Sequence, residues 1–289
     1  MQPHAFGYAR ATSVAEAVRL LRKNGDRAKI LAGGQSLIPL MKLRLANPEF
    51  LIDIGGISEL SALREDGEGL SIGAMVRDRE FEHAELVKTR YPILGDVVKG
   101  LGDPQVRNLG TVGGSLAHAD PAGDWGAALL ALDAHLTLTG PRGERQVPID
   151  EFFKDTFATA LHPDEILTEI RLPAPVPHSG SAYQKLKRKT GDFATVSASA
   201  RLALNPGGAI VEARLGLGAV GPTAIRAPRA EAFLAGKSPD EATFAEAGRL
   251  ASQESSPVPD LHGSAEYKRA MVAVMVRRAL ETAAARARS

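Results

Sequence analysis

Small, hydroxyl and carboxylate side chains gather between residues 102 and 125, in a pattern that suits an anionic ligand. The members are a glycine pair, a hydroxyl on either side of it and two later aspartates: Gly113, Gly114, Thr111, Ser115, Asp120 and Asp124. Glycine allows positive φ angles and close approach of a ligand to the backbone. Residues 127–133, apolar up to Leu132, predict a helix that starts near one of the aspartates, and exposed N–H groups ahead of a helix suit a phosphate. The alternative is a tight turn, because glycine marks turns in most proteins.

The same order of residue types occurs earlier in the chain. Residues 29–32 predict a short strand, after which come Gly33, Gly34, Gln35, Ser36 and an apolar run with helical spacing. Two loops of this kind could hold the two halves of a cofactor that contains a pyrophosphate. Two further glycine pairs, at 55–56 and 207–208, lack this sequel and are interpreted as a turn and a hairpin.

Several other kinds of site are absent from the sequence. No G-x-x-x-x-G-K-[ST] occurs, and the G-x-G-x-x-G at residues 216–221 is not followed directly by a helical pattern, so neither a P-loop nor a Rossmann nucleotide site is supported. The chain has no cysteine, which excludes disulfides and a conventional iron–sulfur cluster within this chain. His118 and Asp120 lack the spacing of a metal motif, so a turn or a place around a cofactor is favoured.

The composition of the chain indicates which kinds of partner and which cellular location to expect. The net charge of +1 gives no indication of a nucleic-acid partner. No apolar run approaches the roughly 20 residues that span a membrane, and the N-terminal residues lack the apolar core of a signal peptide. We therefore expect a cytoplasmic protein that could still associate with the inner face of the membrane through its partners.

The chain resembles the FAD-binding medium subunit of the molybdenum hydroxylase (xanthine dehydrogenase) family. Two segments carry the resemblance, AGGQSLIPLMKLRLANPEFLIDI and GDPQVRNLGTVGGSLAHADPAGDW. It extends over essentially the whole chain, including YQKLKRKTGDFATVSAS, and is closest to the medium subunit of aerobic carbon monoxide dehydrogenase. The resemblance implies FAD as the cofactor, held between two lobes without a Rossmann fingerprint.

The resemblance also implies which residues contact FAD, while no catalytic residue or metal ligand is expected in this chain. Lys185 could stabilise negative charge on a reduced flavin, or could be a surface lysine of a strand. Phe193 stands where carbon monoxide dehydrogenase subunits commonly carry tyrosine, so stacking on the flavin is retained and a hydrogen bond is lost. Leu101 stands where some relatives place an aromatic residue. The implied set is Ile30, Leu31, Ala32, Gly33, Gly34, Gln35, Ser36, Leu37, Leu101, Thr111, Gly113, Gly114, Ser115, Asp120, Asp124, Ile166, Leu167, Lys185 and Phe193.

The strands and helices expected from the sequence, which must position these residues, indicate an α+β protein. By resemblance, residues 1–176 form a two-lobed FAD-binding domain of the vanillyl-alcohol-oxidase/PCMH type, with lobes of about 1–55 and 56–176. The proline-rich residues 173–180 read as a linker, and residues 177–289 form a smaller α+β domain. Strands are expected at 50–54, 69–76, 135–139, 145–149, 166–172, 182–187, 195–203 and 209–219. Helices are expected at 77–90, 91–101, 229–235, 240–252 and 265–284, with a first helix from residue 14 that Gly25 ends.

Together these features predict an electron-transfer subunit of a heteromeric molybdenum hydroxylase, most similar to carbon monoxide dehydrogenase. The expected partners are a large molybdopterin subunit and a small [2Fe-2S] subunit, assembled as a dimer of heterotrimers. FAD would take electrons from the clusters and pass them to a quinone or another acceptor. The alternatives are a subunit of a hydroxylase for an aldehyde, a purine or an N-heterocycle, and a non-catalytic FAD-binding or assembly module.

Overall fold

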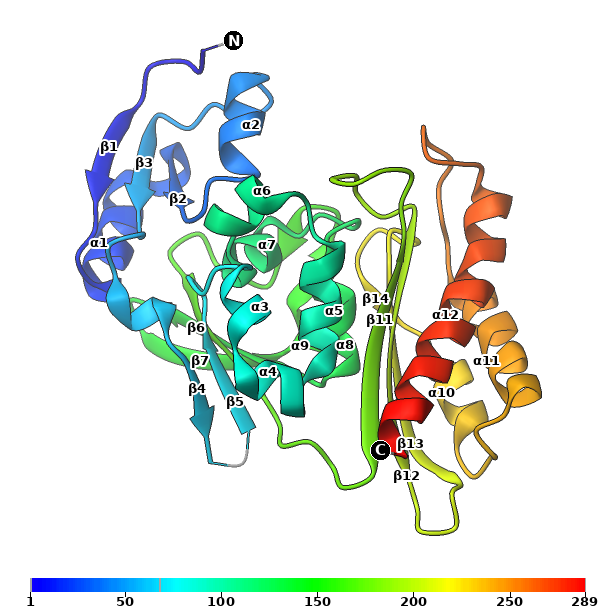
Figure 1. Cartoon of the computed structure of the whole chain (residues 1–289). Coiled ribbons are helices and arrows are strands. Elements are labelled where there is room, and N and C mark those ends of the chain that lie inside the picture. The colour runs from blue at the N-terminus through cyan, green and yellow to red at the C-terminus, as the bar shows by residue number, and fades with distance from the viewer. Residues whose placement is uncertain (1, 68, 289) are drawn as a thin grey trace.

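The first lobe of the computed structural model is a small parallel sheet with one long helix (Figure 1). The structure describes residues 2–67 and 69–288. Both outer strands of the lobe pair in parallel with the central strand, in the order β1-β3-β2. Ser13 caps the helix by accepting a hydrogen bond from the Glu16 N–H. The elements are β1 (Gly7–Arg10), α1 (Val14–Asn24), η1 (Gly25–Arg27), β2 (Ala28–Leu31), α2 (Leu37–Lys42) and β3 (Phe50–Asp53).

The second lobe contains an antiparallel sheet of five strands in the order β4-β5-β10-β6-β7, with helices packed on it. Its core is built around the fully buried Trp125, Phe81 and Phe152. The helix predicted at 77–90 is wrong in its first part, because residues 77–79 form a turn and two short helices follow. The elements are η2 (Ser58–Ser61), β4 (Leu63–Asp66), β5 (Gly69–Gly73), α3 (Glu80–His83), α4 (Glu85–Arg90), α5 (Pro92–Gly100), α6 (Pro104–Leu109), α7 (Val112–His118), α8 (Asp124–Ala131), β6 (His135–Gly140), β7 (Gly143–Pro148), α9 (Ile149–Phe152), β8 (Phe153–Asp155), β9 (Ala158–Thr159) and β10 (Ile166–Leu172).

The C-terminal part is an antiparallel sheet followed by helices, which confirms the predicted α+β class. Its strands follow in the order β11-β12-β13-β14, and the first of them begins inside the segment predicted as a linker. The turn predicted at Gly207-Gly208 joins β12 and β13. The elements are β11 (Ser179–Leu186), β12 (Val196–Leu204), β13 (Ile210–Gly218), β14 (Ile225–Arg226), α10 (Pro228–Leu234), α11 (Glu241–Glu254) and α12 (Ala265–Ala287).

The C-terminal sheet lies between two layers of helices (Figure 1). Because side chains alternate along a strand, Ala198 and Ala200 of β12 join the core on the α12 side. On the other face α8 of the second lobe packs so closely that a methyl group at Gly216 would lie 1.9 Å from the Ala127 carbonyl oxygen. The sheet therefore joins the C-terminal part to the second lobe through small residues.

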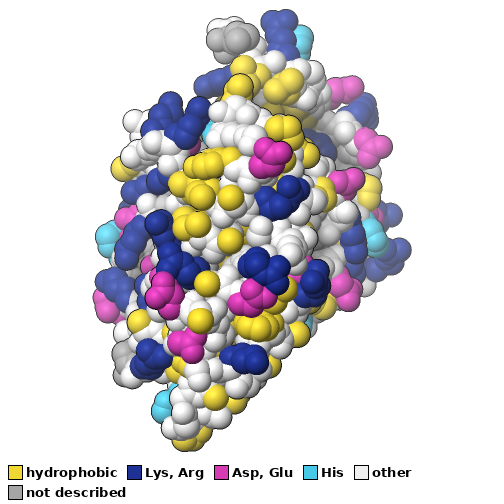
Figure 2. Space-filling view, turned by 90° about the vertical axis from the view of Figure 1, so that its right-hand side faces the viewer, with side chains coloured by type: hydrophobic (Ala, Val, Ile, Leu, Met, Phe, Trp, Pro, Cys, Tyr) yellow, Lys and Arg dark blue, Asp and Glu magenta, His cyan; other side chains and the backbone are white. Residues whose placement is uncertain are grey.

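The outer face on the side of α11 and α12 carries charges of both signs. Figure 2 shows Lys and Arg side chains interspersed with Asp and Glu, and some hydrophobic side chains gathered in its upper half. Among the described residues, no helix is long and apolar enough to cross a membrane.

Candidate functional site

The structure brings two segments into direct contact, the first glycine segment (residues 29–41) and the second glycine segment (residues 102–125). A methyl group at Gly33, in the loop after β2, would lie 1.9 Å from the Leu109 carbonyl oxygen at the end of α6. A methyl group at Gly114 would lie 3.5 Å from the Ala32 Cβ. The absence of side chains at these positions lets the first and second lobes meet backbone to backbone. The two segments that the sequence singles out thus form one junction between the lobes.

The first segment offers a row of unused hydrogen-bond donors. Within residues 2–67 and 69–288, the backbone N–H groups of Gly33, Gly34, Gln35 and Ser36 donate to no acceptor. The segment turns at Gly34, whose φ of +72° is readily adopted by glycine. All four residues are half-buried. Successive unpaired N–H groups form a concavity that favours anions, so the residues present fit the pyrophosphate of FAD.

The second glycine pair lies inside a helix, which corrects the prediction that it precedes one. Thr111 is the N-cap of α7, and its Oγ1 accepts from the Gly114 N–H at 3.2 Å. The Gly113 N–H donates to the Ala74 carbonyl oxygen at 3.0 Å. Because both donors have protein acceptors, this pair is no open phosphate loop. Its contribution is close packing, since a methyl group at Gly113 would lie 2.5 Å from the Ala74 Cβ.

A buried ion pair connects the second lobe to the C-terminal sheet. Lys185 of β11 donates from Nζ to Oδ2 of Asp124, the first residue of α8, at 2.8 Å, and each side chain is 4% exposed. The Tyr183 hydroxyl donates to the other oxygen of Asp124. Burial, together with the neighbouring Asp124, raises the pKa of Tyr183 well above its usual value. Lys185 is therefore a buried side chain and not a surface lysine. Its charge balances the carboxylate of Asp124, which is itself one of the predicted FAD contacts.

Sequence reasoning missed Tyr183, although a signal for it exists. Tyr183 precedes Lys185 by two positions on β11, and the period of a strand places both side chains on one face. It also missed Asp78, a buried carboxyl whose partner Trp125 lies 47 residues away. No local spacing indicates that pair.

The remaining predicted residues occupy separate places around the junction. Ile166 and Leu167 are buried at the start of β10 in different apolar clusters, one shared with the first lobe and one with the second. Leu101 packs, partly buried, on the core of the second lobe. Phe193 is 56% exposed in the loop between β11 and β12. Predicted neighbours of the glycines lie at the end of β2, at the start of α2 and in α7: Ile30, Leu31, Leu37 and Ser115.

The pair of His118 and Asp120 has the character of a turn. Asp120 Oδ1 accepts from the Ala122 N–H at 2.9 Å, and burial lowers the pKa of His118. Among the described residues no group of His, Cys, Asp and Glu could hold a metal ion.

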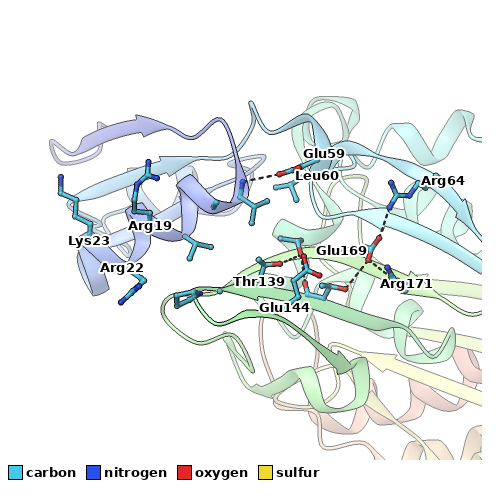
Figure 3. A pocket seen from close by; sticks show the side chains of 17 residues that line it. Arg19, Arg22, Lys23, Glu59, Leu60, Arg64, Thr139, Glu144, Glu169 and Arg171 are labelled. Carbon is cyan, nitrogen blue, oxygen red and sulfur yellow. Dashed lines mark hydrogen bonds and ion pairs between the residues drawn. The ribbon is translucent and has the colours of Figure 1, made fainter.

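A separate cavity of about 1000 Å³ lies between α1 and the sheet of the second lobe (Figure 3). Its wall is mixed, with apolar side chains of α1 and a polar group on β10: Glu169 accepts from Arg171 at 2.7 Å and from the Ser71 hydroxyl at 2.6 Å. Arg22 contributes from α1 and Glu144 from β7. None of the predicted cofactor residues belongs to its described lining, so size alone does not identify the flavin site.

Two family models match the chain, one on each part of the fold. The model described as "FAD binding domain in molybdopterin dehydrogenase" matches residues 4–175, and "CO dehydrogenase flavoprotein C-terminal domain" matches residues 181–283. The chain is 44% identical to the carbon monoxide dehydrogenase medium chain of Hydrogenophaga pseudoflava, covering 99% of both chains. It is 39% identical to the alpha subunit of the 6-hydroxypseudooxynicotine dehydrogenase complex of Paenarthrobacter nicotinovorans, covering 100% of this chain and 97% of that one.

Solved structures of related proteins have the same fold as this chain. A chain of Cu,Mo-CO dehydrogenase superimposes with a TM-score of 0.96 at 42% identity, covering 99% of this chain and 100% of that one. A chain of quinoline 2-oxidoreductase from Pseudomonas putida 86 gives 0.94 at 36% identity, with full coverage of both. The chain therefore belongs to the FAD-binding medium subunits of the molybdopterin dehydrogenases, the molybdenum hydroxylase family that includes carbon monoxide dehydrogenase.

Proposed function

We propose that this chain holds FAD at the junction of its two glycine segments and transfers electrons within a heteromeric molybdenum hydroxylase. The observation that supports the location is the row of four unpaired N–H groups from Gly33 to Ser36, set against the second segment. FAD supplies the redox chemistry when it is bound. The protein's part is to hold the pyrophosphate, to bury Asp124 and Lys185 beside the junction, and to bring Phe193 to the surface.

The proposed partners rest on the family to which the chain belongs. Without cysteine the chain offers no thiolates for an iron–sulfur cluster, so the [2Fe-2S] clusters that we propose as electron donors would belong to a separate, small subunit. Substrate oxidation would take place at molybdenum in a large subunit, with a quinone or another molecule as the final acceptor. We propose a dimer of heterotrimers in the cytoplasm, at the inner face of the membrane. The proposed domain division after residue 176 lies between the two matched segments.

Carbon monoxide is the substrate we favour for the complex. The support is the medium chains of two carbon monoxide dehydrogenases, 44% and 42% identical to this chain over their whole length. Relatives at 39%, 35% and 30% identity are named as subunits of 6-hydroxypseudooxynicotine dehydrogenase, glyceraldehyde dehydrogenase and a putative xanthine dehydrogenase. A hydroxylase for an aldehyde, a purine or an N-heterocycle is therefore the alternative. A non-catalytic FAD-binding or assembly module is the second alternative.

Anaerobic reduction of the native complex tests this proposal. The complex, purified from its host, is mixed in turn with carbon monoxide, an aldehyde, a purine and an N-heterocycle, while the flavin absorbance is followed. We expect carbon monoxide to bleach the flavin. Bleaching by another substrate alone would move the assignment to that hydroxylase, and a flavin that no substrate reduces but dithionite does would favour the assembly module.

Replacement of Phe193 tests the proposed flavin contact. Because its side chain is 56% exposed, Phe193→Ala should change the free energy of unfolding by no more than about 0.5 kcal/mol. Loss of the ring from the flavin should instead shift the flavin midpoint potential in a redox titration of the complex. Val211→Ala on β13, at 55% exposure, is the matched control. Equal potentials in the two variants would remove Phe193 from the site.

A further inference from the structure

A short turn of the second lobe holds the second glycine segment in place. Residues 77–79, which lie between β5 and α3, run alongside residues 107–110, which form the end of α6 and its C-cap. Backbone hydrogen bonds run from the Asp78 N–H to the Gly110 carbonyl (2.9 Å) and from the Arg79 N–H to the Arg107 carbonyl (3.1 Å). Two side chains add bonds to Asn108, Arg77 Nη1 to its carbonyl (3.2 Å) and Arg79 Nη1 to its Oδ1 (3.3 Å). The position of the segment that faces Gly33 thus depends on this turn.

The side chain of Asp78 lies underneath the segment. Asp78 is 4% exposed, and its Oδ1 accepts from the Trp125 indole N–H of α8 at 3.0 Å. A methyl group at Gly110 would lie 2.4 Å from Oδ2. The carboxyl is therefore enclosed between the second glycine segment and the helix that begins with Asp124. A change in the charge of the Asp78 carboxyl would act on the glycine segment and on the helix at short range, in a medium of low dielectric constant.

The surroundings of Asp78 raise the pKa of its carboxyl into the neutral pH range. Burial is the main cause and raises its pKa to about 7. The hydrogen bond from Trp125 lowers the pKa, the charge of Asp124 on α8 raises it, and the charge of Arg107 on α6 lowers it. An ordinary aspartate is fully charged near pH 7, whereas Asp78 carries a proton for part of the time.

We propose that Asp78 is a positioning residue for FAD, which binds more tightly when this carboxyl is uncharged than when it is ionised. The inference rests on the proposed location of the pyrophosphate at the N–H groups of the first glycine segment, against which the second segment packs. A charged Asp78 repels the pyrophosphate from behind the segment, so FAD affinity falls as the pH rises through the neutral range. By linkage, FAD binding favours uptake of a proton by Asp78 to the same extent.

The single tryptophan of the chain gives a direct test of the ionisation. Trp125 donates to Asp78, so its fluorescence in the full chain should change with a midpoint near pH 7. In Asp78→Asn, which keeps an acceptor for the indole and has no charge, this transition should vanish. Asp103→Asn, at the N-cap of α6, is the matched control and should keep it. A transition of the same size and midpoint in Asp78→Asn would overturn the inference.

Cofactor affinity gives the second test, made on the native complex after its flavin is removed. For the unchanged protein, FAD should bind about tenfold more weakly at about pH 8 than at about pH 6, within the usual range of coupling between sites. The Asp78→Asn variant should bind FAD with the same affinity at both pH values, and this affinity should equal the tighter one of the unchanged protein. Trp125→Phe should move the midpoint upward, because the indole hydrogen bond favours the charged carboxylate.

The outcomes separate this inference from the proposed function. An unaltered affinity in Gly33→Ala would overturn the location of the pyrophosphate. A lost affinity in Gly33→Ala combined with a wild-type pH profile in Asp78→Asn would overturn the role of Asp78 alone.

Discussion

Gly33→Ala is expected to remove most of the FAD from the complex. The added methyl group would lie 1.9 Å from the Leu109 carbonyl oxygen, so the first glycine segment must move away from the second. Overpacking of this kind costs about 1–3 kcal/mol, and the same movement displaces the N–H groups of Gly33 and Gly34 from a shared ligand. We expect FAD affinity to fall about tenfold or more, since 1.4 kcal/mol corresponds to a factor of ten in the dissociation constant, so that the variant loses most of its FAD during purification.

Flavin content is measured by absorbance after denaturation, beside a thermal unfolding curve. Gly95→Ala in α5 is the control, because no heavy atom of the described residues, outside the adjoining backbone of its own helix, lies within 4 Å of the added methyl group. That variant should retain its FAD and unfold at the same or a higher temperature, as alanine is favoured over glycine in a helix. Full flavin in Gly33→Ala would mean that the junction does not hold the cofactor.

Lys185→Met is expected to destabilise the chain strongly. It leaves the carboxylate of Asp124 buried, with the Tyr183 hydroxyl as its remaining side-chain partner. Removal of one partner of a buried ion pair typically costs about 3–5 kcal/mol. The free energy of unfolding from urea titration of the full chain measures the loss. The control is Lys88→Met, which breaks the exposed pair with Glu85 (2.6 Å) and should cost no more than about 1 kcal/mol.

A second variant distinguishes an uncompensated charge from lost packing. Asp124→Leu combined with Lys185→Met removes both charges and should recover much of the stability, because apolar replacements of buried pairs are often neutral. Equal stabilities of Lys185→Met and Lys88→Met would show that the pair between α8 and β11 contributes little.

The parts of the fold that local sequence patterns determine could be predicted. The strands of the C-terminal sheet, the hairpin at Gly207-Gly208 and the strands expected at 135–139 and 145–149 each depend on neighbouring residues, and the structure has them at or near the expected positions. The close approach of the two glycine segments also agrees with the sequence pattern, since both pairs of glycines face a neighbouring backbone or side chain.

The parts that depend on distant contacts could not be predicted. Helix α7 contains two glycines in seven residues, and its start is fixed by bonds from its N–H groups to the carbonyls of Val76 and Ala74. The burial of Lys185 depends on Asp124, which lies 61 residues earlier. No spacing in the sequence indicates that an aspartate at position 78 would meet the only tryptophan.

The most direct test of the whole account is purification of the chain from its native host, with a visible spectrum and the masses of all co-purifying subunits. We predict one FAD per copy of this chain, absorbance of iron–sulfur clusters and two additional chains, one of them a large subunit with molybdopterin. A lone colourless protein that takes up no added FAD would contradict the account.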